Sequence, residues 1–224
     1  MKVIILSAGR GERLRPLTDH TPKPLLKAGK LRLIEYTIQS LVKAGFTEVI
    51  INTAHLYEQF PQALGNGELY GATIQYTVEQ SGGLETAGGI INALQLLGDE
   101  PFLVVNGDIW TDYPFEQLNE FELKPSTLGH LIFVDNPKHN PTGDFSLSSG
   151  LITTNDEQEK VTYSGIAVYH PSLFSSYDVH RLALKPILLE AIALKQLSGE
   201  LYQGKWSDIG TAERLSELAT ELNS

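Results

Sequence analysis

The stretch KVIIL at residues 2–6, followed at once by SAGRGERLRPLT at residues 7–18, decides the fold. The first stretch carries four consecutive large apolar side chains, which predict a strand buried on both faces, as in a parallel sheet. The glycine-rich run therefore follows the carboxyl end of that strand. Open α/β sheets bind their ligands beyond this end of their strands, so the run occupies a predicted ligand position.

Strand-like and helix-like segments alternate outward from this stretch. We predict further strands at residues 48–52, 73–78, 102–105 and 128–134, and helices at 33–44, 55–64, 86–97 and 114–122, with Thr86 capping the third helix. This alternation predicts an α/β fold with a doubly wound, mostly parallel, Rossmann-like central sheet. We expect a small antiparallel elaboration from strands at 145–153, 161–169 and 200–203, with helices at 184–195 and 211–222. Because no linker or repeat interrupts the pattern, we predict a single domain over residues 1–224.

The composition limits the classes of function. The formal net charge of −10 argues against general binding to nucleic acids or anionic membranes. No apolar run is long enough for a membrane span, and the first apolar stretch is too short for a secretory signal, so we expect a cytoplasmic protein. The absence of cysteine excludes disulfides, thiolate metal sites and a cysteine nucleophile. Nothing in the sequence implies a protein partner.

One basic segment departs from this acidic composition. Seven of the 17 lysine and arginine residues lie between positions 10 and 32: Arg10, Arg13, Arg15, Lys23, Lys27, Lys30 and Arg32. Such a concentration predicts a local anion site, with phosphate as the leading ligand. A solvated charged loop is the equally open alternative on charge alone.

The glycine-rich run does not match the common phosphate-binding motifs. Gly9 and Gly11 allow the backbone to approach a ligand closely. A dinucleotide-binding fingerprint would need glycine at position 14, which is Leu14, and no G-K-[ST] follows as in a P-loop.

The run SAGRGERLRPLT, together with TPKPL at residues 21–25, resembles the signature of the sugar-nucleotide pyrophosphorylase family. This resemblance implies a GT-A-type nucleotidyltransferase fold and an enzyme that joins a nucleoside triphosphate to a sugar 1-phosphate. It also implies a nucleotide-binding part at about residues 1–110 and a sugar-binding part at about 111–224. The implied contacts to the base and phosphates are Ala8, Gly9, Gly11 and Glu12.

The same resemblance assigns roles to two basic residues. Arg13 is expected to hold the β- and γ-phosphates that leave as pyrophosphate. Lys23, in a loop stiffened by prolines on both sides, is expected to bridge the nucleotide α-phosphate and the sugar phosphate. Arg10 and Arg15 are expected to be solvated or structural.

Two aspartate motifs imply a metal site. FLVVNGD at residues 102–108 resembles the family's strand-terminal G-D motif, and WSDIGTAERL at 206–215 resembles its second aspartate motif. The resemblance implies that Asp108 and Asp208 hold Mg²⁺, an ion that suits a few carboxylates and substrate phosphates. Taken alone, Asp108 is equally a cap of the next element. The histidines show no zinc-like spacing, and Thr211 is predicted to cap the last helix.

The segment at residues 79–89 matches the place where family members read the base. Glu79 is expected to accept the N3–H of uracil, and Gly88 to contact the base through its backbone. The alternative for Glu79 is an exposed charge at the end of a strand. For the sugar, the comparison implies Asn106, Gly143, Ser164, Asp208 and Glu159, although the surroundings of Glu159 also indicate a solvated turn.

The motifs LETAGG, NGDIWTDY and TYSGIAVY, with the short length, most resemble the subfamily that uses UTP and N-acetylmuramate α-1-phosphate in bacterial cell-wall recycling. Other substrates remain open, namely a thymidylyl-, guanylyl- or cytidylyltransferase for glucose 1-phosphate or mannose 1-phosphate. A non-catalytic paralogue that binds a sugar nucleotide is a further alternative, against which Arg13, Lys23 and both aspartates count. The missing third glycine counts against a dehydrogenase. Lys27 and Lys30 receive no role.

Overall fold

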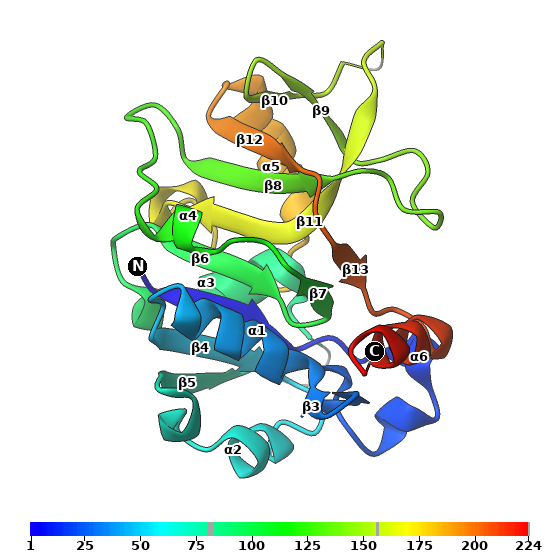
Figure 1. Cartoon of the computed structure of the whole chain (residues 1–224). Helices are drawn as coiled ribbons and strands as arrows, with labels where there is room; N and C mark the ends of the chain where they lie inside the picture. The colour runs from blue at the N-terminus through cyan, green and yellow to red at the C-terminus, as the bar shows by residue number, and fades with distance from the viewer. Residues whose placement is uncertain (80–82, 156, 224) are drawn as a thin grey trace.

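The computed structural model describes residues 1–79, 83–155 and 157–223 (Figure 1). In these residues one mixed sheet of nine strands runs through the molecule in the order β5-β4-β1-β6-β11-β8-β12-β10-β9. Its strands are β1 (Val3–Leu6), β4 (Glu48–Thr53), β5 (Thr73–Val78), β6 (Phe102–Asn106), β8 (Gly129–Val134), β9 (Phe145–Ser148), β10 (Leu151–Thr153), β11 (Lys160–Tyr169) and β12 (Leu197–Tyr202). Two small sheets pair β2 (Lys27–Ala28) with β3 (Leu31–Arg32) and β7 (Ile109–Thr111) with β13 (Trp206–Asp208).

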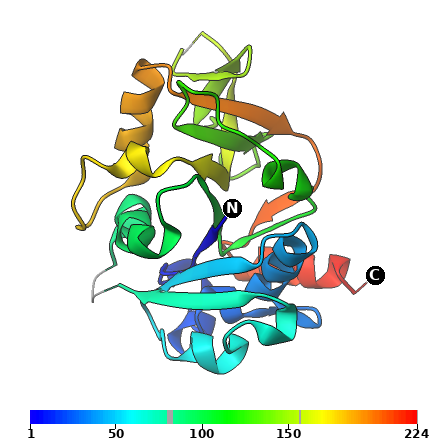
Figure 2. The same ribbon diagram turned by 90° about the vertical axis from the view of Figure 1, so that its left-hand side faces the viewer.

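The helices cover both faces of the sheet. They are α1 (Leu33–Lys43), α2 (Gln59–Leu64), α3 (Glu85–Leu97), α4 (Glu116–Asn119), α5 (Leu184–Ala193) and α6 (Ala212–Glu221), with 3₁₀ turns η1 (Glu12–Leu14), η2 (Leu17–Asp19), η3 (Lys23–Leu25), η4 (Glu68–Tyr70) and η5 (Pro171–Phe174). Figure 2 shows the sheet between α3 and α5 on one side and α1 and α4 on the other. The expected α/β fold with helices on both faces is confirmed.

The strand β1 shows why the sequence folds in this way. Val3 and Ile5 belong to the core under α1 and α2, whereas Ile4 belongs to the opposite core under α3 and α5. All three are fully buried, and burying such a side chain contributes about 1.5–3 kcal/mol. Parallel neighbours β4 and β6 pair with β1 on either side, with Leu6 opposite both Asn52 and Asn106. This register brings two polar side chains to the carboxyl end of β1.

The second half of the sheet departs from a simple continuation of the parallel run. β11 is inserted antiparallel between β6 and β8, and β8 then pairs parallel with β12. The single strand predicted at 145–153 is a hairpin of β9 and β10, because Ser149 and Gly150 adopt positive φ angles of 51° and 79°. The antiparallel elaboration is therefore present, and it is continuous with the main sheet.

The positions predicted for the helix ends are less accurate than the prediction that a helix is present. The segments 55–64 and 114–122 are helical only over Gln59–Leu64 and Glu116–Asn119. The prediction that Thr86 caps its helix is wrong, since Leu84 is the N-cap of α3. The cap predicted at Thr211 is confirmed, because its side chain accepts a hydrogen bond from the Arg214 N–H at 3.4 Å.

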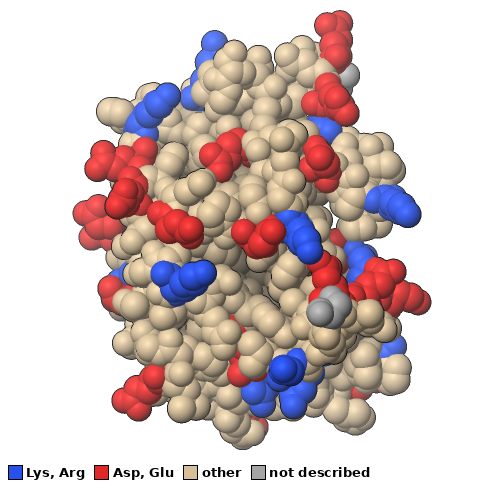
Figure 3. Space-filling view, in the orientation of Figure 1, with Lys and Arg blue, Asp and Glu red and all other residues tan. Residues whose placement is uncertain are grey.

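Two further observations concern the surface and the helix lengths. Acidic and basic side chains are interspersed over the face seen in Figure 3, without a broad basic area. In the described part of the chain, no helix combines the length and the apolar character that crossing a bilayer requires.

Candidate active site

A cavity of about 1230 Å³ opens at the carboxyl ends of the parallel strands. Its walls come from the segments that follow β1, β4, β5 and β6, and from the beginning of α3. This is where an open α/β sheet binds ligands. The predicted nucleotide contacts Ala8, Gly9, Gly11 and Glu12 all line it.

The glycine-rich loop depends on its two glycines for different reasons. Gly11 has a φ of 67°, and a Cβ there would lie 3.0 Å from the Thr18 Cγ2 and 3.1 Å from the Lys23 Cβ. A larger residue would therefore be strained and would also displace Lys23. A Cβ at Gly9 would meet nothing within 4 Å. Gly9 thus leaves its backbone open to a ligand in the cavity.

Lys23 and Asp108 meet in the wall of the cavity. The Lys23 Nζ donates to the Asp108 Oδ2 at 2.5 Å, and the lysine side chain is only 10% exposed. Asp108 follows β6 through Gly107, whose N–H donates to the Leu6 carbonyl oxygen at 2.8 Å. A Cβ at Gly107 would lie 2.5 Å from the Ser7 Oγ. Glycine at this position therefore allows Asp108 to approach the loop after β1.

Asp208 reaches the same neighbourhood from the other end of the chain. In the β7–β13 pair Asp208 lies opposite Ile109, and the Ile209 N–H donates to the Asp108 carbonyl oxygen at 2.8 Å. The Asp208 Oδ1 accepts from the Arg214 Nη1 at 2.5 Å and lies 2.8 Å from the His139 Nε2. Asp208 does not itself line the cavity, although Gly210 does.

The two carboxylates fit the Mg²⁺ that the resemblance implies. No group of three histidine, cysteine, aspartate or glutamate side chains that could hold a metal occurs in the described residues. Mg²⁺ is commonly bound by one or two carboxylates together with substrate phosphates and water, and does not need a third protein ligand. Within the described residues, one oxygen of each aspartate is engaged and the other has no protein partner. Oxygen donors of this kind suit a hard cation.

The opposite end of the cavity holds a buried carboxylate network. The Glu79 Oε1 accepts from the Asn52 Nδ2 at 2.7 Å, and its Oε2 accepts from the Leu84 N–H at 2.6 Å. The Asn52 Oδ1 in turn accepts from the Ser7 N–H at 2.7 Å. Burial raises the pKa of Glu79, and the two hydrogen bonds oppose this rise. With 5% of its surface exposed, Glu79 is not the solvated strand-end charge of the alternative interpretation.

The structure does not support Gly88 as a backbone contact to the base. Its N–H donates to the Leu182 carbonyl oxygen at 3.2 Å, and a Cβ would lie 2.2 Å from the His180 carbonyl oxygen. Gly88 therefore allows α3 to pack against the segment before α5. Gly83, with a φ of 71°, and Thr86 line the cavity instead. Residues 80–82 of the predicted base-reading segment lie outside the described residues.

The predicted sugar contacts are only partly brought to the cavity. Asn106 lines it and packs against Gly165, where a Cβ would lie 2.5 Å from the Asn106 Nδ2. Ser164 is buried, and its hydroxyl donates to the Ile132 carbonyl oxygen at 2.7 Å. It also accepts from the Ile166 N–H at 3.2 Å. Its hydroxyl therefore holds the irregularity in β11 together, and Ser164 does not line the cavity.

Gly143 and Glu159 also lie outside the lining of the cavity. Gly143 has a φ of 65°, and a Cβ there would lie 2.7 Å from the Lys160 carbonyl carbon. This glycine is needed for a close approach of two backbone segments. Glu159 is exposed in the stretch before β11, as the solvated-turn interpretation predicts.

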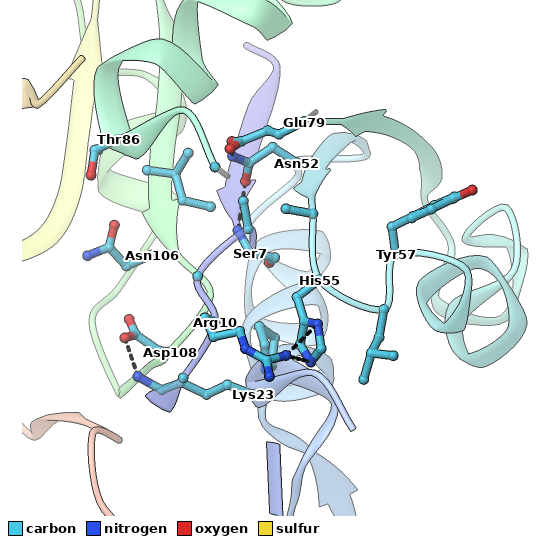
Figure 4. Close-up of a pocket in the computed structure, with 18 of the residues that line it drawn as sticks. Ser7, Arg10, Lys23, Asn52, His55, Tyr57, Glu79, Thr86, Asn106 and Asp108 are labelled. Carbon is cyan, nitrogen blue, oxygen red and sulfur yellow. Dashed lines mark hydrogen bonds and ion pairs between the residues drawn. The ribbon is translucent and has the colours of Figure 1, made fainter. Parts of the chain in front are cut away.

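Sequence reasoning missed four polar residues at the site. Arg214 and His139 hold Asp208, while Arg10 and His55 lie in the cavity wall and contact each other (Figure 4). Two of them carried a local signal: Arg10 belongs to the predicted basic segment, and Arg214 lies three residues after the predicted cap Thr211. The contacts of His139 and His55 join distant segments, which no short motif reveals.

The chain is similar to known proteins over nearly its whole length. The model of the family described as nucleotidyl transferase matches residues 2–224. N-acetylmuramate alpha-1-phosphate uridylyltransferase of Neisseria meningitidis serogroup B is 46% identical, over 97% of this chain and 96% of that protein. Mannose-1-phosphate guanyltransferase of Aspergillus fumigatus is 33% identical over 94% of this chain, which spans 61% of that longer relative.

Solved structures share the fold at lower identity. The inositol-1-phosphate CTP transferase from T. maritima superposes with a TM-score of 0.77 at 17% identity, covering 100% of this chain and 96% of that one. HddC from Yersinia pseudotuberculosis, complexed with GMP-PN, gives a TM-score of 0.80 at 17% identity, covering 99% of both chains.

Proposed function

The chain belongs to the nucleotidyl transferase family, and from this premise we propose that it joins UTP to N-acetylmuramate α-1-phosphate, giving UDP-N-acetylmuramate and pyrophosphate. The observation that carries the proposal is the Lys23–Asp108 contact in a cavity that also holds the buried carboxylate of Glu79. The 46% identity to a protein named for this reaction supports the choice of both substrates. We further propose that the reaction takes place in the cytoplasm as a step of cell-wall recycling, as the resemblance of its motifs implies.

The transfer needs no nucleophile from the protein. The sugar phosphate has a second pKa of about 6, so its phosphate is largely dianionic at neutral pH. One of its oxygens forms a bond to the α-phosphorus of UTP. The bond between that phosphorus and the oxygen that bridges the α- and β-phosphates breaks, and pyrophosphate leaves. Positioning and charge stabilisation supply the acceleration in such reactions.

The chain's own residues divide this work along the cavity. Lys23, held by Asp108, places its ammonium where the α-phosphate and the sugar phosphate meet. Arg13 holds the two phosphates that leave together. Asp108 and Asp208 would hold Mg²⁺, which supplies further neutralisation of phosphate charge when bound. Asn106, the last residue of β6, lines the cavity and would contact the sugar.

The preference for uracil is assigned to Glu79. Each of its oxygens already accepts one hydrogen bond and keeps a second acceptor position. The uracil N3–H can donate to that position, whereas cytosine presents a lone pair there. Because Gly88 is engaged with Leu182, we assign the contact to the uracil O4 to Gly83 or Thr86 in the cavity wall.

The test is pyrophosphate release from each of UTP, CTP, GTP and dTTP with N-acetylmuramate α-1-phosphate, glucose 1-phosphate and mannose 1-phosphate. We expect the highest kcat/KM for UTP with N-acetylmuramate α-1-phosphate. A clear preference for another sugar phosphate would contradict the substrate and leave the reaction class standing. If no pair releases pyrophosphate, the enzymatic proposal itself is wrong and the non-catalytic alternative gains support.

A further inference from the structure

Arg10 is a basic residue of the glycine-rich loop to which neither the resemblance nor the proposed mechanism gives a role. It lies between Gly9 and Gly11, and it lines the cavity with Arg13 and Lys23. Figure 4 shows Arg10, Lys23 and Asp108 at one end of the cavity and Glu79 and Asn52 at the other. Arg10 therefore lies at the phosphate end rather than at the base end. The expectation that it is merely solvated or structural does not describe this position.

The carboxylate nearest to Arg10 is taken by another residue. The Arg15 Nε donates to the Asp19 Oδ1 at 2.7 Å, whereas the Arg10 Nη2 lies 3.7 Å from that same oxygen. Asp19 therefore compensates mainly the charge of Arg15. The charge of Arg10 is left to interact with what enters the cavity.

His55 orients Arg10 without cancelling its charge. The His55 Nε2 lies 3.0 Å from the Thr18 carbonyl oxygen, which ties the ring to the backbone of the loop. The Arg10 Nη1 contacts both ring nitrogens, with 2.7 Å to the Nδ1 and a still closer approach to the Nε2. An imidazole is never anionic, so it cannot neutralise a guanidinium. Arg10 is thus held in place by a partner that carries no negative charge.

The two cations next to Arg10, Lys23 and Arg13, differ from each other in whether a carboxylate is paired with them. Lys23 is matched by Asp108 at 2.5 Å. Arg13, in contrast, forms no salt bridge with any described residue. The phosphate end of the cavity therefore presents two guanidinium groups that are weakly compensated: Arg13 has no ion pair among the described residues, and Arg10 has only the 3.7 Å contact to Asp19. Two such groups match the charge of a bound pyrophosphate better than that of a single phosphate.

We propose that Arg10, oriented by His55, binds the terminal phosphates of the nucleoside triphosphate and the pyrophosphate that leaves. This assignment rests on the proposed function. It makes Arg10 a determinant of triphosphate recognition, with no contact to the base or the α-phosphate. His55 is then a positioning residue, because it acts through Arg10.

The test is direct binding, measured by titration calorimetry with three probes at one Mg²⁺ concentration and one ionic strength. The probes are UTP, inorganic pyrophosphate, and UMP, which carries only the base and the α-phosphate. For Arg10→Ala we expect UTP and pyrophosphate to bind about ten- to a hundred-fold more weakly, as for the loss of a charge-assisted contact. UMP affinity should not change. Arg10→Lys should recover part of the loss, because it keeps the charge but not the fork of donors.

Lys30→Ala is the matched control, since Lys30 belongs to the same basic segment, is exposed and does not line the cavity. It should bind all three probes as the wild type does. His55→Ala should weaken pyrophosphate binding, and should add no further loss when Arg10 is already alanine.

Three results would overturn the assignment: unchanged pyrophosphate affinity in Arg10→Ala, an equal loss of UMP affinity, or an equal effect of Lys30→Ala. These outcomes are separate from the proposed function, which depends on pyrophosphate release by the wild type with a sugar phosphate.

Discussion

Gly107 allows a decisive perturbation of the site, because Gly107→Ala adds one methyl group where two segments touch. The new Cβ would lie 2.5 Å from the Ser7 Oγ and 2.9 Å from the Leu6 carbonyl oxygen, whereas ordinary contact begins at 3.4 Å. The serine hydroxyl can rotate away, but the Leu6 carbonyl belongs to the backbone of β1. The carboxyl ends of β1 and β6 must therefore separate by about half an ångström, and Asp108 moves with β6.

The size of the effect follows from this displacement. Overpacking of a well-packed region typically costs about 1–3 kcal/mol of unfolding free energy. A domain of this length loses roughly 2–4 °C of Tm for each kcal/mol. A misplacement of about 1 Å between reacting groups can cost about a hundred-fold in rate, so a loss of roughly ten-fold or more in kcat is expected here. We expect turnover to fall further than stability, because the strained contact lies next to Asp108.

The assay is pyrophosphate release together with thermal unfolding, and the chain supplies two controls. Gly98→Ala also adds a methyl group, at a φ of 87°, but meets nothing within 4 Å, so it should lower the Tm without a comparable loss of kcat. Ser7→Ala removes only the contact that rotation of the hydroxyl can also relieve, so it should restore little of the turnover lost in Gly107→Ala. Wild-type kcat and Tm in Gly107→Ala would refute this reasoning.

Three further predictions concern the cavity itself. Asp108→Asn and Asp208→Asn should each nearly abolish turnover while leaving the far-ultraviolet circular dichroism unchanged. EDTA should stop turnover by the wild type until Mg²⁺ is restored, and full activity in EDTA would contradict the metal assignment. Arg13→Ala should slow both synthesis and pyrophosphorolysis about ten- to a hundred-fold, since the same pyrophosphate is held in both directions, whereas Lys23→Ala should lower kcat more than it raises the KM for UTP. The ratio of kcat/KM for UTP to that for CTP should fall as the pH falls through the raised pKa of Glu79. Protonation of this carboxylate removes the acceptor for the uracil N3–H and offers a donor to the cytosine N3. In Glu79→Gln the ratio should not depend on pH, and an equally flat ratio in the wild type would rule out the titration of Glu79 as its cause.

The parts of the fold predicted correctly are those that local sequence pattern controls. The run KVIIL could be assigned to a doubly buried strand because apolar side chains on both faces leave no alternation. The insertion of β11 between β6 and β8 could not be predicted, because strand order depends on pairing between distant segments. Helix ends were misjudged for a related reason. At Thr86, the threonine lines the cavity instead of capping α3, and tertiary packing determined where the helix begins.

The same distinction applies to the candidate site. Gly9, Gly11 and Lys23 belong to one continuous motif, and all of them line the cavity. Gly88 and Ser164 were assigned on short matches, and packing partners that the motif does not contain decide their surroundings. The Gly88 N–H is engaged by Leu182, some ninety positions away, and the Ser164 hydroxyl bridges an irregularity that exists only once β11 pairs with β8. A glycine or serine in a motif thus shows that a small residue is required there, without showing which neighbour requires it.

The two aspartates show how the last part of the chain completes the site. Asp108 is fixed by the main sheet, whereas Asp208 depends on the short β7–β13 pair and on the docking of α6. That docking rests on a small apolar cluster of Ala28, Leu33, Ile209 and Leu218, which is separate from the two large cores. Ala28 lies in the β2–β3 hairpin that follows Lys23, and Leu33 comes directly after this hairpin, so the same cluster packs against the segment that carries the lysine. A small cluster can open with a lower free energy than the main cores. The position of Asp208 relative to Lys23 and Asp108 is therefore set by local packing around α6, and activity can be lost there while the nine-stranded sheet stays folded.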